Sequence, residues 1–226
     1  MSNRRQRQIG TVASILEERY GPRPWREHPS ALDELVLTIL SQHTSDVNSE
    51  RAFAALKSRF PSWESIIDAP ISAIAEAIRG GGLAKQKAPK IQGALREVMA
   101  QTGGDLDFLT HFSVAEGRKW LVSLPGVGAK TASCVLLFAL GLPAMPVDTH
   151  VHRVAGRIGL IGLHDSPKQA QDILEAEVGA NRDQIYALHM NLIAHGRAVC
   201  IARRPRCGEC PLTRCCDYYV RLSANA

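Results

Sequence analysis

Five of the six cysteines of this 226-residue chain fall in one short segment. Four of them are spaced C-x6-C-x2-C-x5-C, and these are Cys200, Cys207, Cys210 and Cys216. Four thiolates so close in sequence can surround one metal centre, but four-cysteine zinc sites usually contain two C-x2-C pairs and this segment has one. The wider spacings on either side of that pair, six and five residues, suit an iron–sulfur cluster bound by one wrapped loop. The spacing therefore favours an iron–sulfur cluster over zinc, and Cys215 remains an alternative to its neighbour Cys216.

A second candidate for chemistry is the glycine-rich segment LPGVGAK, which ends at Lys130. Gly126 and Gly128, on either side of Val127, permit a tight turn with exposed backbone N–H groups. At the start of the following apolar segment, such groups form an anion site. Lys130 falls in the first turn of the expected helix, where the helix dipole and burial both disfavour a protonated amine. The pattern is compatible with a nucleophilic lysine and with a lysine that only contacts phosphate.

A carboxylate follows 18 residues after Lys130, in the segment PVDTHVH. This residue, Asp148, follows Pro146 and precedes an expected helix over 149–158, so it is placed to cap that helix. A capping bond would fix the position of the carboxylate without excluding a chemical role, and both readings stay open. His150 is a further candidate for lining a pocket beside Asp148.

Basic residues gather in three segments of the chain, whose formal net charge is +5. Residues 79–96 hold five lysines and arginines without an acid, residues 1–8 hold three arginines, and residues 197–214 hold five arginines against one acid. Such segments fit a phosphate-binding surface, although solvated loops would give the same pattern. The candidate phosphate contacts are Lys85, Lys87, Arg203 and Arg204.

The elements that position these residues are expected to be helices. Aromatic residues make up only 5% of the chain, so the core consists largely of aliphatic residues and alanine, a mix that favours helix. Apolar residues recur at helical spacing over 32–40, 53–60, 71–78 and 91–99. Further helices are predicted from the capping box Ser113–Glu116 to about Ser123, over Thr131–Leu140, and from Ser166-Pro167 to about Gly179. No segment alternates like a strand, so the sequence predicts an all-α fold.

No segment of the chain resembles a secretion signal or a membrane span. No apolar stretch follows the arginines at the start of the sequence, and the most apolar region, Ala132–Val147, is interrupted by Gly141, Pro143 and Pro146. We therefore expect a soluble intracellular protein without a membrane partner. In a reducing compartment, clustered cysteines more often bind metal than form disulfides.

Three motifs in order, LPGVGAKTA, PVDTHVHRV and the C-x6-C-x2-C-x5-C spacing, resemble the endonuclease III family of helix-hairpin-helix DNA glycosylases. The resemblance runs from about Leu32 to Tyr218. It implies that Lys130 is the catalytic lysine and Asp148 the catalytic aspartate. It also implies that the four spaced cysteines bind a [4Fe–4S] cluster, which selects Cys216 over Cys215.

The resemblance further implies a two-domain, all-α fold with a DNA groove between the domains. A helical barrel domain would span residues 29–142, and a cluster domain would combine residues 1–28 with 143–226. The implied partner is double-stranded DNA that contains damaged bases or abasic sites. The damaged nucleotide would flip out of the stack, Lys130 would attack C1′, and β-elimination would cut the strand. We expect a monomer in the cytoplasm, associated with the nucleoid if the source is a bacterium.

Other residues match the part of the family that reads DNA. Leu83 matches a leucine that wedges into the base stack, although it would also suit a simple packing contact. The glutamine that fills the vacated hole in some members corresponds to Gln42 or to His43. The sequence departs from many members at Ala84, where a bulky residue is usual, and over 103–119, which is longer than in compact members. Lesion preference is therefore left open.

Two other functions remain compatible with these motifs. One is a monofunctional glycosylase of the same superfamily, acting on uracil, mismatched thymine or adenine opposite oxidised guanine. The adenine-specific branch usually lacks a lysine at the position of Lys130. The other is a weakly active or silent DNA-binding module that uses the glycine turn only for phosphate. The joint presence of Lys130 and Asp148 favours a bifunctional glycosylase and abasic-site lyase for oxidised pyrimidines.

Overall fold

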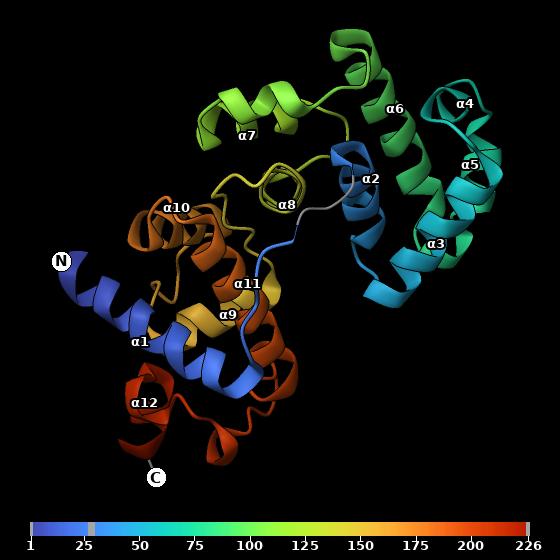
Figure 1. Cartoon of the computed structure of the whole chain (residues 1–226). Helices are drawn as coiled ribbons and strands as arrows, with labels where there is room; N and C mark the ends of the chain where they lie inside the picture. Colours follow the sequence, from blue (N-terminus) through green and yellow to red (C-terminus); the bar gives the residue numbers. More distant parts are fainter. Residues whose placement is uncertain (1, 27–29, 225–226) are drawn as a thin grey trace. The chain divides into compact units, whose positions relative to one another are not determined.

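The computed structural model describes residues 2–26 and 30–224, with side chains from residue 6 onward, so the side chains of Arg4 and Arg5 lie outside the described part. All regular secondary structure in these ranges is helical, which confirms the predicted all-α class. Contacts within the chain divide it into two compact units (Figure 1). The continuous unit is Glu27–Leu142, and the discontinuous unit joins Met1–Arg26 to Pro143–Ala226.

The continuous unit is organised around helix α2. Its N-cap, Ser30, accepts a hydrogen bond from the backbone of Asp33, and Leu35, Ile39 and Leu40 are fully buried. Helix α2 packs against α3, α6 and α8, as the blue, green and yellow ribbons of Figure 1 show. The elements are α2 (Ala31–Ser41), α3 (Asp46–Arg59), α4 (Trp63–Ile67), α5 (Ile71–Ala77), η1 (Arg79–Gly81), α6 (Ala84–Thr102), η2 (Asp107–His111), α7 (Val114–Val122), α8 (Ala129–Cys134) and η3 (Val135–Ala139).

Two predictions in this unit can be compared directly with the structure. The capping box of Ser113 and Glu116 is present at the start of α7, so that helix start is confirmed. The apolar helix predicted over Thr131–Leu140 begins two residues earlier and becomes a π-helix from Val135, where the N–H of Leu140 donates to the Val135 carbonyl. The apolar pattern could not show this change, because both helix types bury the same run of residues.

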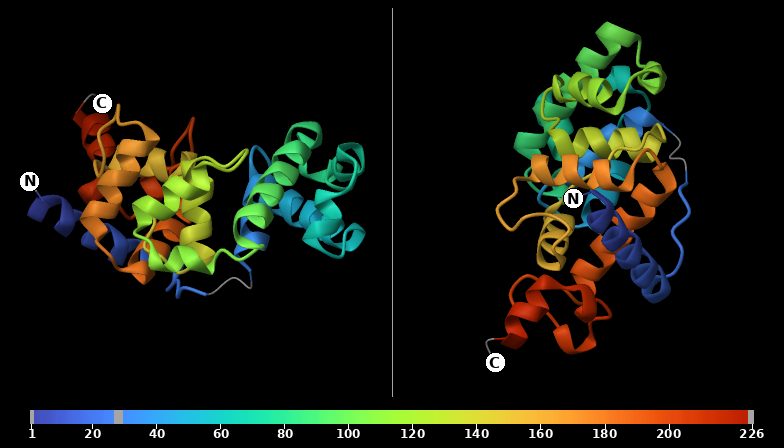
Figure 2. Two further views of the ribbon diagram at one scale, coloured as in Figure 1. Left: turned by 90° about the horizontal axis from the view of Figure 1, so that it is seen from above. Right: turned by 90° about the vertical axis from the view of Figure 1, so that its left-hand side faces the viewer.

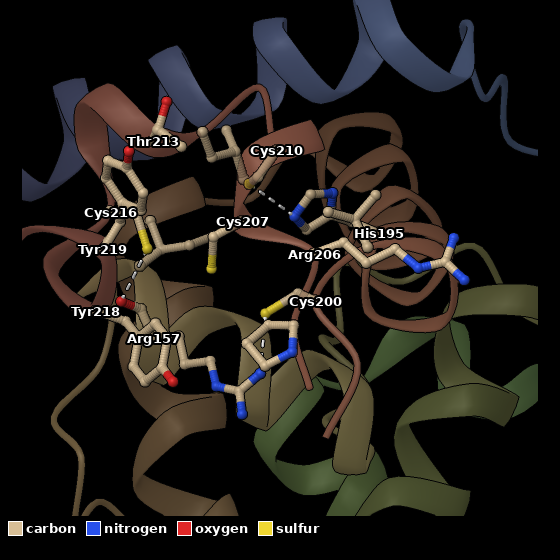
Figure 3. A pocket seen from close by; sticks show the side chains of 14 residues that line it. Arg157, His195, Cys200, Arg206, Cys207, Cys210, Thr213, Cys216, Tyr218 and Tyr219 are labelled. Atoms are coloured by element: carbon tan, nitrogen blue, oxygen red, sulfur yellow. Dashed lines mark hydrogen bonds between the residues drawn. The ribbon is translucent and has the colours of Figure 1, made fainter. Parts of the chain in front are cut away.

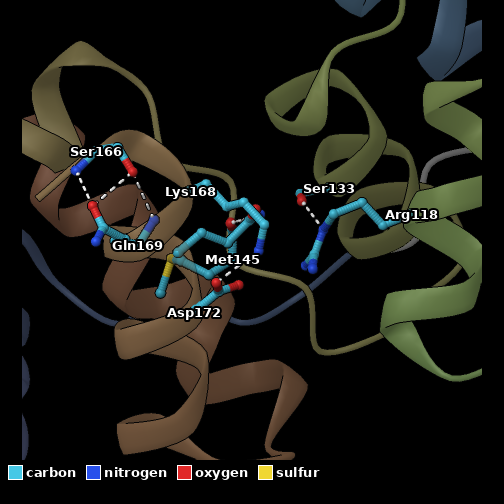
Figure 4. Close-up of polar contacts among 8 residues, drawn as sticks. Arg118, Ser133, Met145, Ser166, Lys168, Gln169 and Asp172 are labelled. Carbon is cyan, nitrogen blue, oxygen red and sulfur yellow. Dashed lines mark hydrogen bonds and ion pairs between the residues drawn. The ribbon is translucent and has the colours of Figure 1, made fainter.

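The discontinuous unit is built around α11. Helix α11 packs against α9 and α1 (Figure 2). Helix α1 buries Ile9, Val12 and Leu16. Helix α10 has the predicted N-cap, Ser166, followed by Pro167, and it ends before Gly179 as expected. The structure adds a capping box between Ser166 and Gln169, drawn in Figure 4. No helix in the described ranges is long and apolar enough for a membrane span. The elements are α1 (Ser2–Tyr20), α9 (Thr149–Ile158), α10 (Pro167–Val178), α11 (Arg182–Ala198), η4 (Cys207–Glu209), η5 (Thr213–Cys215) and α12 (Asp217–Ala224).

Candidate active site and metal centre

The glycine segment forms a tight turn between α7 and α8. The N–H of Val127 donates to the Leu124 carbonyl at 3.2 Å, and Gly126 adopts φ 77°. A Cβ at position 126 would lie 2.6 Å from the Cβ of Lys90, so both the backbone conformation and the close approach of α6 require glycine. The Val127 side chain is buried, so only its backbone faces the turn. Any DNA contact at this residue would therefore involve main-chain atoms.

Lys130 is the second residue of α8 and is half-buried. The neighbouring Thr131 is buried, and its hydroxyl lies 3.4 Å from the amide nitrogen of Gln42. The same nitrogen donates to the Gly126 carbonyl at 3.1 Å. Gln42 thus contacts the glycine turn and the first turn of α8 together, and the structure brings this predicted residue to Thr131, the residue that follows Lys130.

Helix α8 is also held from the side of α7, near its C-terminal end. Arg118 donates from Nε to the hydroxyl of Ser133 at 3.1 Å (Figure 4). Ser133 is fully buried, so this bond satisfies a polar group within the core. The helix that carries Lys130 is therefore fixed by contacts on two of its sides.

Two non-glycine residues of the described chain adopt positive φ, and both were singled out as DNA-reading candidates. His43, directly after the C-cap residue Gln42 of α2, has φ 54° and is exposed. Leu83, the N-cap residue of α6, has φ 51° and a side chain that is 45% exposed. A left-handed conformation costs a non-glycine residue about 1–2 kcal/mol. An exposed leucine held in such a conformation is typical of a functional contact.

The two candidate lysines of α6 differ in their surroundings. Lys85 is exposed, as a phosphate contact requires. Lys87 is 2% exposed, and its Nζ donates to the carbonyls of Leu40 at 2.6 Å and Gly81 at 2.8 Å. The prediction of a surface phosphate contact is therefore wrong for Lys87. A signal for its burial was present, since Lys87 lies four residues before Ile91 on the apolar stripe of this helix.

Asp148 caps α9, as predicted. Its Oδ1 accepts a hydrogen bond from the N–H of Val151 at 2.7 Å, and the residue is half-buried. The backbone before it is held as well. The carbonyl of Pro146 lies 2.9 Å from Nδ1 of the buried His189, while the N–H of Met145 donates to a Glu175 carboxylate oxygen at 2.7 Å. The carboxylate of Asp148 is therefore held by α9, and the backbone before it is held by α10 and α11 of the same unit.

His150 is tied to an arginine that the sequence reasoning missed. Nη2 of Arg153 lies 3.1 Å from Nδ1 of His150 and donates to the Gly196 carbonyl at 2.8 Å. Nε of the same arginine donates to the carbonyl of Cys200 at 3.0 Å. Arg153 therefore connects α9, the end of α11 and the first cysteine. The sequence could have pointed to Arg153, because it lies one helical turn after Thr149, the first residue of α9.

The four predicted cysteines line one pocket, and their sulfur atoms face the same space in Figure 3. Cys200 follows α11, Cys207 begins η4, Cys210 follows η4, and Cys216 follows η5. Cys215 is not among the lining residues, and its sulfur lies 3.4 Å from the Leu212 carbonyl. Within the described residues, no three histidine, cysteine or acidic side chains are close enough together to hold one metal ion.

Two polar side chains approach the sulfur atoms. Nη1 of Arg157 lies 3.4 Å from the sulfur of Cys200 and also donates to the Ile201 carbonyl at 2.9 Å. Nε2 of His195 lies 3.5 Å from the sulfur of Cys210. Arg157 was another residue that the sequence reasoning missed. It lies one turn beyond Arg153 on α9, a spacing that places both on the same face of the helix.

Burial determines the protonation of this pocket. It raises the pKa of Cys210 to about 11 and also raises the pKa of Cys216. Burial, helped by the nearby Arg19 charge, lowers the pKa of His195 to about 4. His195 is therefore neutral at pH 7, and its Nδ1 lies 3.0 Å from the hydroxyl of Tyr20. If Nδ1 accepts from that hydroxyl, Nε2 carries the hydrogen and donates to the Cys210 sulfur.

The arginines between the first two cysteines are exposed. Arg203 and Arg204 both lie in the segment after Ile201, and Arg157 holds the start of that segment through two backbone carbonyls. Its end is fixed by the N–H of Arg206, which donates to the Val199 carbonyl at 2.9 Å. The structure thus presents both predicted arginines to solvent on a segment that is fixed at its two ends.

The chain is similar in sequence to known DNA repair proteins. The family profile described as HhH-GPD superfamily base excision DNA repair protein matches residues 36–179. Endonuclease III of Rickettsia conorii is 36% identical over 190 residues, which cover 83% of this chain and 84% of that protein. A candidate DNA glycosylase of Arabidopsis thaliana is 41% identical over 176 residues, or 76% of this chain, and the match spans 58% of that relative's length.

A solved structure of a non-covalent endonuclease III–DNA complex is similar over nearly the whole chain. The TM-score is 0.83 and the sequence identity 27%, with 97% of this chain and 98% of the other covered. The similarity therefore extends beyond residues 36–179 to α1 and to the cysteine segment.

Proposed function

The chain belongs to the HhH-GPD superfamily of base excision DNA repair proteins and to its endonuclease III family, and from that premise we propose that this DNA glycosylase is bifunctional. It removes an oxidised pyrimidine from double-stranded DNA and then cleaves the strand as an abasic-site lyase. The observation that carries the lyase step is Lys130, a half-buried amine in the first turn of α8 directly after the glycine turn. An imine-forming lyase requires such an amine.

In this reaction, the target nucleotide first leaves the duplex, because its C1′ is unreachable within the stack. The neutral amine of Lys130 attacks C1′, and the bond between C1′ and the base breaks as the base departs. Opening of the sugar ring leaves a Schiff base between C1′ and the lysine nitrogen. Loss of a proton from C2′ then expels the 3′ phosphate, and water releases Lys130.

Asp148 supplies the carboxylate for this chemistry. A fixed carboxylate can accept the proton that the attacking amine gives up, or stabilise positive charge that develops on the sugar. The capping bond uses Oδ1, so the second carboxylate oxygen can serve the reaction. His150, two residues after Asp148 and in contact with Arg153, is the further residue that we assign to this site.

DNA is bound through three kinds of contact. The main-chain atoms of Gly126, Val127 and Gly128 and the side chains of Lys85, Arg203 and Arg204 bind phosphates, which position the duplex without reading its sequence. The exposed Leu83 wedges into the base stack. Gln42 or His43 fills the hole that the flipped nucleotide leaves. Support comes from the exposure of these basic side chains and from the backbone conformations of His43 and Leu83.

A [4Fe–4S] cluster bound by Cys200, Cys207, Cys210 and Cys216 completes the proposal. The four thiols share one pocket, Cys215 does not line it, and His195 and Arg157 can donate to the ligand sulfurs. A single zinc would draw its four sulfurs to within about 3.8 Å of one another, whereas a multinuclear cluster keeps them farther apart. The cluster, when bound, holds the arginine-bearing segment in place.

Borohydride trapping on DNA with a single abasic site tests the lyase. The wild-type chain should form a covalent complex, because borohydride reduces the imine. Lys130→Gln should form none and should not cleave the strand, while its affinity for the same DNA changes little. Lys119→Gln is the matched control, since Lys119 is an exposed lysine of the preceding helix α7.

The outcomes separate the alternatives. Base release by the wild-type chain without a trapped complex would identify a monofunctional glycosylase. Binding without either reaction would identify a DNA-binding module. A trapped complex with Lys130→Gln would show that another amine is the nucleophile. A panel of duplexes with oxidised pyrimidines, uracil and mismatched thymine, measured in single turnover, tests the proposed lesion class.

A further inference from the structure

Lys87 is the one lysine of the described chain that is buried, and the reaction proposed above leaves it without a role. It is the fourth residue of α6, and its ammonium bridges two carbonyls from separate segments, those of Leu40 and Gly81. Leu40 lies in the last turn of α2, where carbonyls lack partners within the helix and the helix dipole favours a positive charge. A cation is therefore suited to this position.

The two bridged carbonyls lie just before the two residues with left-handed backbone. His43 follows Leu40 by three residues, and Leu83 follows Gly81 by two. The position of Gly81 is further restricted, because a Cβ there would lie 2.8 Å from the Cβ of Ala52 in α3. The Leu83 carbonyl, in turn, accepts from the backbone N–H of Lys87 at 3.0 Å. Lys87 thus contacts both turns through its side chain and one of them through its backbone as well.

From this arrangement we infer that Lys87 is a positioning residue, which joins the Gln42–His43 turn to the Leu83 loop so that both enter the DNA as one preformed unit. The inference rests on the proposed function, in which Leu83 wedges the stack and the other turn fills the hole. The geometry supplies the reason for a joint insertion. A wedge that opens the stack without a residue to fill the hole would leave the flipped state unstabilised.

The buried site also explains why a lysine, rather than an apolar residue, stands on the apolar stripe of α6. Burial and the nearby Lys90 charge lower the pKa of Lys87, yet a single side chain with three donors can satisfy two buried carbonyls. An apolar residue of the same length would leave both carbonyls without this partner. The two turns would then be free to move independently.

Lys87→Met removes the bridge and keeps the length of the side chain. With wild-type and variant at saturating enzyme, the single-turnover excision rate on a lesion in duplex DNA should fall by at least about tenfold, and the fluorescence change of a base analogue beside the lesion should weaken in parallel. Borohydride trapping on a single-stranded oligonucleotide with an abasic site needs no wedge, so it should change by less than about twofold. Gln86→Met, at an exposed position of the same helix next to Lys87, is the matched control and should leave both rates unchanged at saturation.

A double-variant cycle distinguishes positioning from a general loss of stability. Leu83→Ala and Lys87→Met should be strongly non-additive in the duplex excision rate, because Lys87 acts through the placement of Leu83. Additive effects, or equal losses on duplex and single-stranded DNA, would overturn the inference. If the wild-type chain forms no covalent complex with borohydride, the proposed lyase activity is wrong. This outcome differs from those that contradict the role of Lys87, so the two proposals are tested separately.

Hydrogen exchange of the wild-type chain provides a measurement that does not depend on the folding of a variant. The backbone N–H of Gln42 is bonded to the Ile39 carbonyl, and that of Gly82 to the Arg79 carbonyl. If Lys87 joins the two turns, peptides that contain these amides should open with the same free energy and should gain protection together on binding of abasic-site DNA. Independent opening of the two turns would contradict the bridge, even if Lys87→Met did not fold.

Discussion

The carboxylate of Asp148 caps α9, and in the proposed reaction it also acts chemically; a pair of substitutions can separate the two roles. Asparagine caps a helix about as well as aspartate, whereas alanine costs about 0.5–2 kcal/mol at an N-cap. Asp148→Asn should therefore unfold at nearly the wild-type temperature but lose most of its excision and trapping rates. Asp148→Ala should lose both stability and activity. Thermal unfolding and single-turnover rates, measured on the same preparations, provide the comparison.

Full activity in a stable Asp148→Asn variant would reduce this residue to a helix cap. Wild-type activity in Asp148→Ala would show that the reaction needs neither the carboxylate of Asp148 nor its cap on α9. Ser166→Ala provides a control for capping alone, because Ser166 caps α10 through the same kind of bond and stands outside the proposed reaction.

At the scale of single residues, the sequence was sufficient where a residue's surroundings depend on its neighbours in the sequence. The cap at Asp148 follows from its place before Thr149, and the exposed Lys85 follows from its acid-poor segment. Lys87 could not be assigned in this way. Its partners are carbonyls 47 and 6 residues away in sequence, and no pattern of residue types records which carbonyls a fold leaves unpaired.

At the scale of elements, hydrophobic periodicity predicted the segments of α2, α3, α5 and α6, but it did not mark α1, α4 or α12. It could not predict the change to a π-helix at Val135, because α and π turns bury the same apolar run. Nor could it show that α1 and α11 pack together, since their contact joins segments on either side of a large part of the chain. The capping box of Ser113 and Glu116 could be predicted, because it depends on residues only three positions apart.

The loop from Cys200 to Cys216 supports a prediction of its own. Cys200→Ala should abolish the visible absorbance of the purified protein and leave the loop open to proteolysis, because one of the four ligands is lost. Cys215→Ala should keep the absorbance and about four iron atoms per chain, since Cys215 does not line the pocket. Metal analysis and absorbance spectra of the two variants are the measurement. Metal analysis that finds one zinc per chain and no iron would show that the four cysteines form a zinc site.

At the scale of the whole molecule, the basic surface determines how binding depends on salt. Removal of one phosphate contact should lower the slope of log affinity against log salt by about one unit. Arg203→Ala and Lys85→Ala should each do so, with similar losses on damaged and undamaged duplexes. The control is Lys168→Ala, since Lys168 is exposed but paired with Asp172 at 2.8 Å. An unchanged slope for Arg203→Ala would place the DNA away from the cysteine loop.

The discontinuous unit has a consequence for the chain as it is synthesised. Helix α1 leaves the ribosome early, but it packs against α10 and α11, and Pro167, the start of α10, follows Tyr20 by about 150 residues. At translation rates of roughly 5–20 residues per second, that interval lasts about 7–30 s. In this time the continuous unit can be completed, while Ile9, Val12 and Leu16 have no core to enter. We therefore expect the nascent α1 to be a site for chaperone binding until α10 and α11 emerge.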